Sequence, residues 1–346
     1  MAVQKSLLTF AVLAVLIVSA SGSPSSNKTV TVNLMVDYDV PLHPTEEQLN
    51  EAHKLFVPII NEINGRGLKA TIFTTSDLTT SIERLYLSNV GRSQNIELAI
   101  NGNNTGELLA SKPYSEQKTL LENAKKWLDS AHYCGINTID ARGFKPQSFS
   151  QNEDTFRVLD EMGMVYDAGF KAGILYLPGH RNDTWPYLAE GHKFYVVPIS
   201  SIELPGERAY MSDSFAKEEK KLSGGAWEKL LINKFDEAAK NGEPMVVSIS
   251  VNTSGSGGYL DALRSFLDYA TSKNASFVTT MDLVNISKGE DLNDLAAGMA
   301  LNPADNKSGC SECNKARNIS LNITLSNTTG NDTGTIRLVR FEAKPS

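Results

Sequence analysis

The sequence is poor in cysteine and has no excess of positive charge. With three cysteines in 346 residues, no disulfide framework holds the fold. For Cys310 and Cys313, a C-x-x-C pair, we favour a small loop disulfide over a metal site, which would lack two ligands. The net charge of −7 provides no basic surface to displace the counterions of phosphates, so we expect no nucleic-acid partner.

Several common functional motifs are also missing. The sequence has no P-loop, no dinucleotide-binding glycine fingerprint and no G-x-S-x-G motif. His53, His132, His180 and His192 show no metal-ligand spacing among themselves, so we interpret each as a surface or helix histidine. The sequence therefore offers no ready-made nucleotide, serine-hydrolase or histidine-metal site.

Beyond the N-terminus, no apolar run is long enough to span a bilayer. Residues 1–22 are interpreted as a signal peptide, because Lys5 precedes an apolar run and small residues close the segment. An uncleaved membrane anchor is the alternative, and only then would the membrane be a partner. In both cases we expect the rest of the chain to be secreted or held at the cell surface.

The sequence is also rich in N-glycosylation sequons, which fit an exported glycoprotein. They begin at Asn27, Asn103, Asn182, Asn252, Asn274, Asn285, Asn306, Asn318, Asn322, Asn327 and Asn331.

The hydrophobic pattern alternates between strands and helices for about 260 residues. We expect strands at 30–39, 69–75, 95–100, 138–144, 165–170, 192–200, 244–252 and 275–280, with helices at 45–67, 76–90, 115–135, 152–163, 226–242 and 259–274. This alternation predicts an α/β fold with a parallel sheet, specifically a distorted (β/α) barrel of about seven units spanning 23–288. An open doubly wound sheet is the alternative. Residues 289–346 are expected to form a linker and a short, glycosylated β-rich tail.

In parallel barrels, functional groups lie where strands end. The first strand ends in Asp37, Tyr38 and Asp39, and Asn101 follows the third strand, with Thr105 four residues later. The last long strand ends at Ser248 and Ser250, and the segment ARGFKPQSF contributes Arg142 and Lys145.

The order of these segments resembles the NodB-homology polysaccharide deacetylases, carbohydrate esterase family four. The phrases that carry the resemblance are VNLMVDYDVP, KATIFTT, ELAINGNNTGELL, RGFKPQSFSQNEDTFRVLDEMGMVYDAGF and MVVSISVNTSGSGGYLDALRSFLDYATSKNASFVTTMDLV. The resemblance implies a divalent metal, usually zinc, held by an aspartate and two histidines. The metal lowers the pKa of bound water, one aspartate acts as base, and a late histidine protonates the leaving amine.

Mapped onto this sequence, the resemblance finds most of the machinery replaced. Asp37 matches the base, which would be vestigial here. Tyr38 stands at the metal-binding aspartate, and Asn101 and Thr105 stand at the two histidines. Ser250, or less favourably Ser248, stands at the late histidine. Because phenol, amide and hydroxyl groups are poor zinc ligands, we expect no metal cofactor.

Other residues could form a different site. Asp39 shares a strand face with Asp37 and, with loop carbonyls and His43, could replace the lost ligands for a hard cation. Arg142 and Lys145 could bind a sugar or an acidic group, or form a salt bridge to Asp37. Trp185 lies in a loop where it could stack on a sugar ring, although core packing is favoured.

We therefore predict an exported protein with a deacetylase-like barrel and no metal-dependent deacetylase activity, retained to bind a cell-surface or extracellular glycan or for a cell-envelope role. Two alternatives remain open: an active carbohydrate deacetylase with a rearranged site around Asp37 and Asp39, and a structural surface glycoprotein.

Overall fold

The computed structural model describes residues 29–40, 44–75, 90, 95–130, 140–204 and 206–290. The predicted signal peptide, the tail from 291 onward with Cys310 and Cys313, and His43 lie outside these ranges. So does the predicted helix at 76–90, except for its last residue. The predicted domain boundaries stay predictions.

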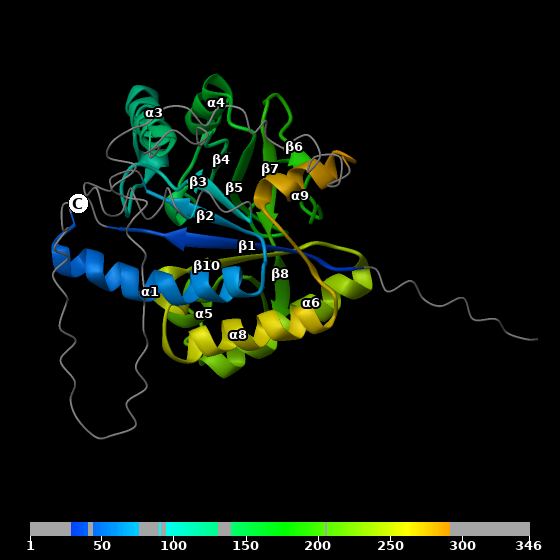
Figure 1. Ribbon diagram of the computed structural model, residues 1–346. Helices are drawn as coiled ribbons and strands as arrows, with labels where there is room; N and C mark the ends of the chain where they lie inside the picture. Colours follow the sequence, from blue (N-terminus) through cyan, green and yellow to red (C-terminus); the bar gives the residue numbers. More distant parts are fainter. Residues whose placement is uncertain are drawn as a thin grey trace, which may run out of the picture. The chain divides into compact units, whose positions relative to one another are not determined.

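The elements alternate as the sequence predicts (Figure 1). The strands are β1 (Thr31–Tyr38), β2 (Ala70–Thr74), β3 (Ile96–Ile100), β4 (Gly143–Phe144), β5 (Tyr166–Lys171), β6 (Tyr187–Leu188), β7 (Tyr195–Ile199), β8 (Ser201–Leu204), β9 (Glu207–Tyr210), β10 (Met245–Ser250) and β11 (Ser276–Val278). The helices are α1 (Glu46–Gly65), α3 (Tyr114–Ser130), α4 (Glu153–Met162), α5 (Asp213–Glu218), α6 (Gly224–Asn241), α7 (Val251–Ser254), α8 (Gly257–Ser272) and α9 (Thr280–Ser287), with short 3₁₀ turns at Leu109–Ser111 and Gln147–Phe149.

Among the described residues, nine strands form one curled, mainly parallel sheet in the order β10-β1-β2-β3-β4-β5-β7-β6, with β11 paired to β1 off this path, while β8 and β9 form a separate two-stranded sheet. All neighbours from β10 to β7 are parallel, and β6 is antiparallel at the edge. The two ends of this sheet approach each other: Ser200 N donates to the Val246 carbonyl, and Ser248 N to the Met211 carbonyl, each at 3.0 Å. The predicted distorted barrel is therefore confirmed, and the open-sheet alternative is wrong.

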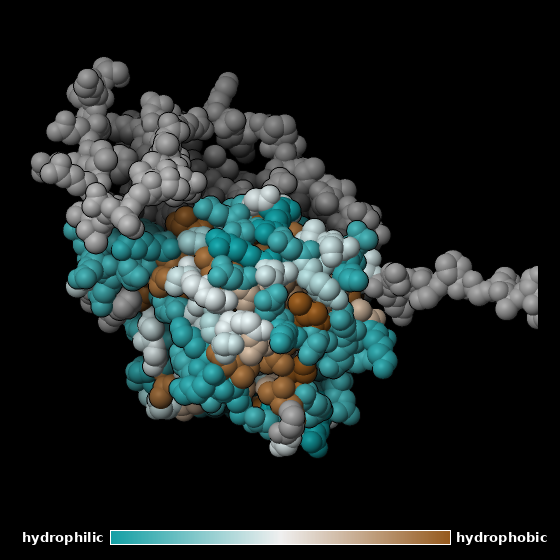
Figure 2. Space-filling view, turned by 90° about the horizontal axis from the view of Figure 1, so that it is seen from below, coloured by the Kyte–Doolittle hydropathy of each residue, from teal (hydrophilic) through white to brown (hydrophobic). Residues whose placement is uncertain are grey.

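Helices cover the outer face of the curled sheet and its inner face lines the barrel, which explains why the strands are buried almost along their whole length. In Figure 1, α1, α6 and α8 lie below β1 and β10, while α3 and α4 lie above the middle of the sheet. Figure 2 shows that hydrophilic side chains cover most of the lower face, with apolar ones in small groups. Thr45 caps the start of helix α1, where its Oγ1 accepts from Gln48 N at 3.2 Å.

A buried polar network fills the barrel at the amino ends of its strands. The Glu97 carboxylate accepts from Thr71 Oγ1 at 2.9 Å, from Tyr166 Oη at 2.7 Å and from Met281 N at 2.9 Å. Burial raises the pKa of Glu97 despite these bonds. Each oxygen of this carboxylate accepts a hydrogen bond, so we interpret the network at the amino ends of the strands as structural. The functional site is then expected at the carboxyl ends of the strands.

Candidate functional site

Asp37, near the end of β1, is held in a nearly buried ion pair. The ammonium of Lys145, which follows β4, donates to Asp37 Oδ2 and, at 2.8 Å, to Ser248 Oγ of β10. Ser248 Oγ donates to Asp37 Oδ2 at 2.9 Å. The side chains of Lys145 and Asp37 are 6% and 15% exposed. Three separate strands thus build one charge-balanced group of Asp37, Lys145 and Ser248, called here the Asp37 cluster.

Asp39 lies beside this cluster and titrates near neutrality. Asn101 Nδ2 donates to Asp39 Oδ1 at 3.0 Å. Burial raises the pKa of Asp39 to about 7, and the charge of Asp37 adds to the rise, while Lys145 and the Asn101 bond oppose it. Asp39 is therefore about half protonated at neutral pH.

Asn101 and Thr105, which the family resemblance maps to two histidines, also contact residues at the end of β1. Asn101 contacts Asp39, and Thr105 Oγ1 donates to the Val40 carbonyl at 2.7 Å. Gln147 holds their loop in place, because its Nε2 donates to the Asn101 and Asn104 carbonyls at 3.0 and 2.9 Å. The structure thus brings the third strand's loop and the end of the first strand together.

Tyr38 lies on the opposite face of β1. Its ring stacks on Phe56 of α1, with centroids 4.2 Å apart and planes 10° apart, and it is fully buried. Because strand side chains alternate between faces, Asp37 and Asp39 face the interior of the barrel and Tyr38 faces α1. Asp39, and not Tyr38, is therefore the residue beside Asn101, and the assignment of Tyr38 to the metal position stays a prediction.

Of the two serines considered for the position of the family's late histidine, Ser248 and not Ser250 contacts Asp37. Ser250 caps α7, where its Oγ accepts from Asn252 N at 3.2 Å, and its N donates to Asp213 Oδ1 at 2.9 Å. Asp213 is fully buried, which raises its pKa to about 7 although it accepts several hydrogen bonds. The chain turns into a helix at Ser250, so Ser248 is the serine that contacts Asp37.

Two other predicted site residues lie away from the cluster. Arg142 is an exposed residue that pairs with Asp140, and it precedes β4 instead of following it. The strand predicted at 138–144 forms only at Gly143–Phe144 among the described residues, which places Arg142 at the amino end. Trp185 is half-buried and packs against the hydrophobic core.

Sequence reasoning missed Lys171, the last residue of β5. Its ammonium lies 3.7 Å from the ring centroid of Phe149 and 4.0 Å from that of Tyr210. Burial and the like charge of Lys145 lower the pKa of Lys171 to about 8, against the opposing charge of Glu219. The available signal was a lysine ending the strand-like YDAGFK, at the carboxyl end where functional groups gather.

Phe149 is held over Lys171 by an unusual backbone. Ser148 and Phe149 have φ angles of 52° and 55°, in the left-handed region that residues with a Cβ seldom adopt. Phe149 and Tyr210 meet edge to face, with centroids 5.5 Å apart. Strained backbone of this kind concentrates at ligand-binding sites.

These residues do not form a zinc site. Within the described ranges, no group of three or more His, Cys, Asp or Glu side chains is placed to hold a metal ion. The charge of Asp37 is balanced by Lys145, and Asn101 and Thr105 direct a donor N–H and O–H toward oxygen atoms. The donor set thus lacks imidazole and offers at most one uncommitted carboxylate, which does not fit zinc.

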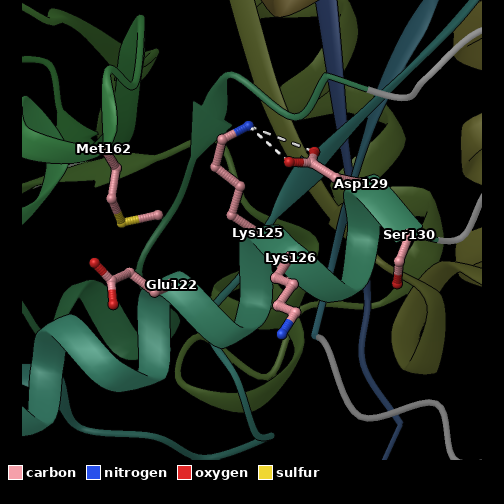
Figure 3. A pocket seen from close by; sticks show the side chains of 6 residues that line it. All are labelled: Glu122, Lys125, Lys126, Asp129, Ser130 and Met162. Carbon is pink, nitrogen blue, oxygen red and sulfur yellow. Dashed lines mark hydrogen bonds and ion pairs between the residues drawn. The ribbon is translucent and has the colours of Figure 1, made fainter.

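A hollow of about 490 Å³ lies elsewhere, on the surface of α3 and the end of α4 (Figure 3). It is lined by Glu122, Lys125, Lys126, Asp129, Ser130 and Met162. Lys125 pairs with Asp129 and donates to the Ala141 carbonyl at 2.8 Å, just before β4. The hollow lies at the opposite end of the strands from Asp37, and two of the charged side chains that line it, Lys125 and Asp129, pair with each other. We therefore do not place the functional site there.

No family model matches this chain, and no curated protein is similar to it in sequence at a significant level. Solved structures do match its fold. A protein assigned as a polysaccharide deacetylase from Mycobacterium smegmatis aligns with a TM-score of 0.57 and 15% identity, over 77% of this chain and 93% of that one. Another from Pseudomonas aeruginosa PAO1 gives 0.58 and 13%, over 75% and 91%.

Puue allantoinase aligns equally well, with a TM-score of 0.59 and 13% identity over 75% of this chain and 91% of its own. The same barrel therefore occurs with a different named activity, and the chemistry must be argued from residues. At these identities the comparison establishes the architecture: the chain has the barrel fold of the polysaccharide deacetylases.

Proposed function

We propose that this protein is an exported glycoprotein whose deacetylase-like barrel works without a metal ion and has been retained to bind a cell-surface or extracellular glycan. The Asp37 cluster is the observation that carries this proposal. The carboxylate that the family resemblance assigns to the catalytic base is bound here by the ammonium of Lys145 and the hydroxyl of Ser248.

The charge of Lys145 disfavours a metal at this end of the barrel. An ammonium and a dication about 4 Å apart repel each other by about 8 kcal/mol at an effective dielectric constant of about 20. Without a metal, the pKa of the attacking water is not lowered toward neutrality, which leaves amide hydrolysis slow.

The described sequons are compatible with export and glycosylation. Asn182, Asn252 and Asn274 are exposed, and Asn103 and Asn285 are half-buried. No helix in the described ranges is long and apolar enough to cross a membrane. The three exposed asparagines are therefore accessible to solvent.

Glycan binding is supported by the shape and chemistry of the barrel mouth. Loops after β3, β4 and β5 surround the Asp37 cluster, and half-buried aromatic rings from Phe149 and Tyr210 lie there. Sugar rings stack on aromatic faces through their C–H groups, while hydroxyl and amide groups such as Asn101 provide hydrogen bonds.

A second candidate, deacetylation without a metal, is favoured by one observation. The pKa of Asp39, about 7, suits a group that accepts and returns a proton at physiological pH. In that mechanism Asp39 would take the proton of water and give it to the leaving amine.

The two candidates separate in one set of measurements on the secreted full-length protein. We expect metal analysis to find zinc far below one per chain, and no acetate release from acetylated chitin oligomers or peptidoglycan fragments. Titration with a glycan panel should give saturable binding.

Acetate release that persists in chelator and disappears in Asp39→Asn, but not in the control Asp268→Asn on the exposed face of α8, would establish the second candidate instead. Stoichiometric zinc with chelator-sensitive turnover would refute both. Absence of binding across the whole panel would leave the structural glycoprotein as the remaining function.

A further inference from the structure

Lys171 is a half-buried cation without an anionic partner. Among the described residues, no oxygen atom lies within hydrogen-bond or ion-pair distance of its ammonium, which contacts the rings of Phe149 and Tyr210 instead. Ring faces attract a cation but cannot replace a hydrogen-bond acceptor. Its N–H donors therefore remain available to a ligand.

The charges around Lys171 are otherwise balanced. The ammonium of Lys145 is paired with Asp37, and Arg208, which lies against the turn at Gly173, is paired with Glu203. Glu219 is exposed and beyond ion-pair distance of Lys171. Lys145 and Arg208 already have carboxylate partners, so the anionic group of a ligand would be attracted mainly to Lys171 and would balance its charge.

The groups beside Lys171 suggest what carries that charge. The strained Ser148–Phe149 turn and strand β9 hold two half-buried rings in edge-to-face contact, at an interplanar angle of 83°, and both rings contact the ammonium. Aromatic rings beside an ammonium suit a ligand that joins an apolar sugar face to a small monoanion.

We propose that Lys171 binds the carboxylate of a uronic acid residue, so that the glycan recognised by this protein is an acidic one. This inference rests on the proposed function and specifies its ligand class. In this proposal, Lys171 donates hydrogen bonds to the carboxylate, and Phe149 and Tyr210 pack against the sugar ring.

The test is calorimetric titration of the full-length protein with oligogalacturonate and with the same oligomer fully methyl-esterified, which keeps the backbone but removes the charge. We expect the ester to bind at least about 10-fold more weakly, because a hydrogen bond to a charged group contributes roughly 1.5–3 kcal/mol. Lys171→Met should weaken oligogalacturonate binding by a similar factor, and Lys171→Arg should retain most of it.

Lys273→Met is the matched control, since Lys273 also lies over a ring, 5.5 Å from the centroid of Tyr269, but is exposed and directly follows α8. It should change nothing. A second readout is proton uptake at pH 8, measured in buffers of different ionisation enthalpy. Binding of a carboxylate should protonate Lys171 fully in the wild type, and this uptake should vanish in Lys171→Met.

Equal binding of acid and ester, or an unchanged affinity in Lys171→Met with normal thermal unfolding, would overturn the inference. If the protein binds neutral chitin oligomers independently of Lys171, glycan binding stands and only the acidic specificity falls. If no glycan binds at all, both the inference and the proposed function fail.

Discussion

Replacing Lys145 by methionine removes the only formal charge that balances Asp37 within the cluster. The variant keeps the length and apolar volume of the side chain but leaves the Asp37 carboxylate with Ser248 as its hydrogen-bond donor. One carboxylate oxygen, Oδ1, already has no hydrogen-bond partner among the described residues. The variant therefore removes the charge of Lys145 together with its hydrogen bonds to Asp37 and Ser248, with little change in packing.

The expected cost follows from the burial of the pair. Removing one partner of a buried ion pair typically costs 3–5 kcal/mol, because the remaining charge is left uncompensated. Lys145 is 6% and Asp37 15% exposed, and Ser248 still donates, so we expect the lower end, about 3 kcal/mol. The double variant Lys145→Met/Asp37→Asn should recover about 2 kcal/mol, since no charge is then stranded.

The measurement is equilibrium unfolding in urea at pH 7, followed by circular dichroism and by tryptophan fluorescence to check two-state behaviour. Lys54→Met is the control, because Lys54 forms an exposed pair with Glu51 on α1 and its loss should leave the unfolding free energy unchanged. A loss below about 1 kcal/mol in Lys145→Met, or no recovery in the double variant, would refute the account of the Asp37 cluster.

Three further outcomes are expected. Burial raises the pKa of Asp167 to about 8, above its unfolded value, so its contribution to stability is complete below about pH 4 and is lost as pH rises toward 8. The unfolding free energy of Asp167→Asn should therefore fall less between pH 5 and pH 8 than that of the wild type, by at least about 1 kcal/mol. An identical fall in both proteins would refute this. Gly143→Ala should destabilise by roughly 2–3 kcal/mol in urea unfolding, because its Cβ would lie 2.0 Å from the Tyr166 ring, whereas Gly225→Ala, with open space around it, should be neutral or slightly stabilising. Enzymatic deglycosylation followed by mass spectrometry should find glycan on Asn182, and unmodified Asn182 in protein secreted from eukaryotic cells would contradict the proposal that this exposed sequon is glycosylated.

Much of the site could be anticipated from local sequence. The alternation of apolar segments predicted the barrel, and the rule that parallel strands present function at their carboxyl ends selected Asp37, Asp39, Asn101 and Lys145. The salt bridge from Lys145 to Asp37 was one of two interpretations that the sequence left open. The structure decides between them, because it brings the ends of β1 and β4 within contact distance across the barrel.

The errors share one cause, which is that strand boundaries and faces are set by pairing. Tyr38 was aligned by motif position, but the pleat of β1 turns it toward Phe56. Arg142 was placed within a strand predicted at 138–144, but β4 begins one residue later, at Gly143. Lys171 carries no motif, and its significance arises only from Phe149 and Tyr210, which other segments bring to it.

By itself, the sequence determined the alternation of strands and helices, the lack of histidine at the positions Asn101, Thr105 and Ser250 that the family resemblance maps to histidines, and the sequons. These are properties of residue identity and local spacing. The tertiary structure alone decided which side chains meet at the carboxyl ends of the strands: that a lysine ammonium balances the Asp37 carboxylate, and that a second lysine contacts two rings and has no acceptor among the described residues. Such contacts depend on the curl of the sheet, which brings together residues more than one hundred positions apart in the sequence. A local sequence pattern cannot predict contacts over such separations.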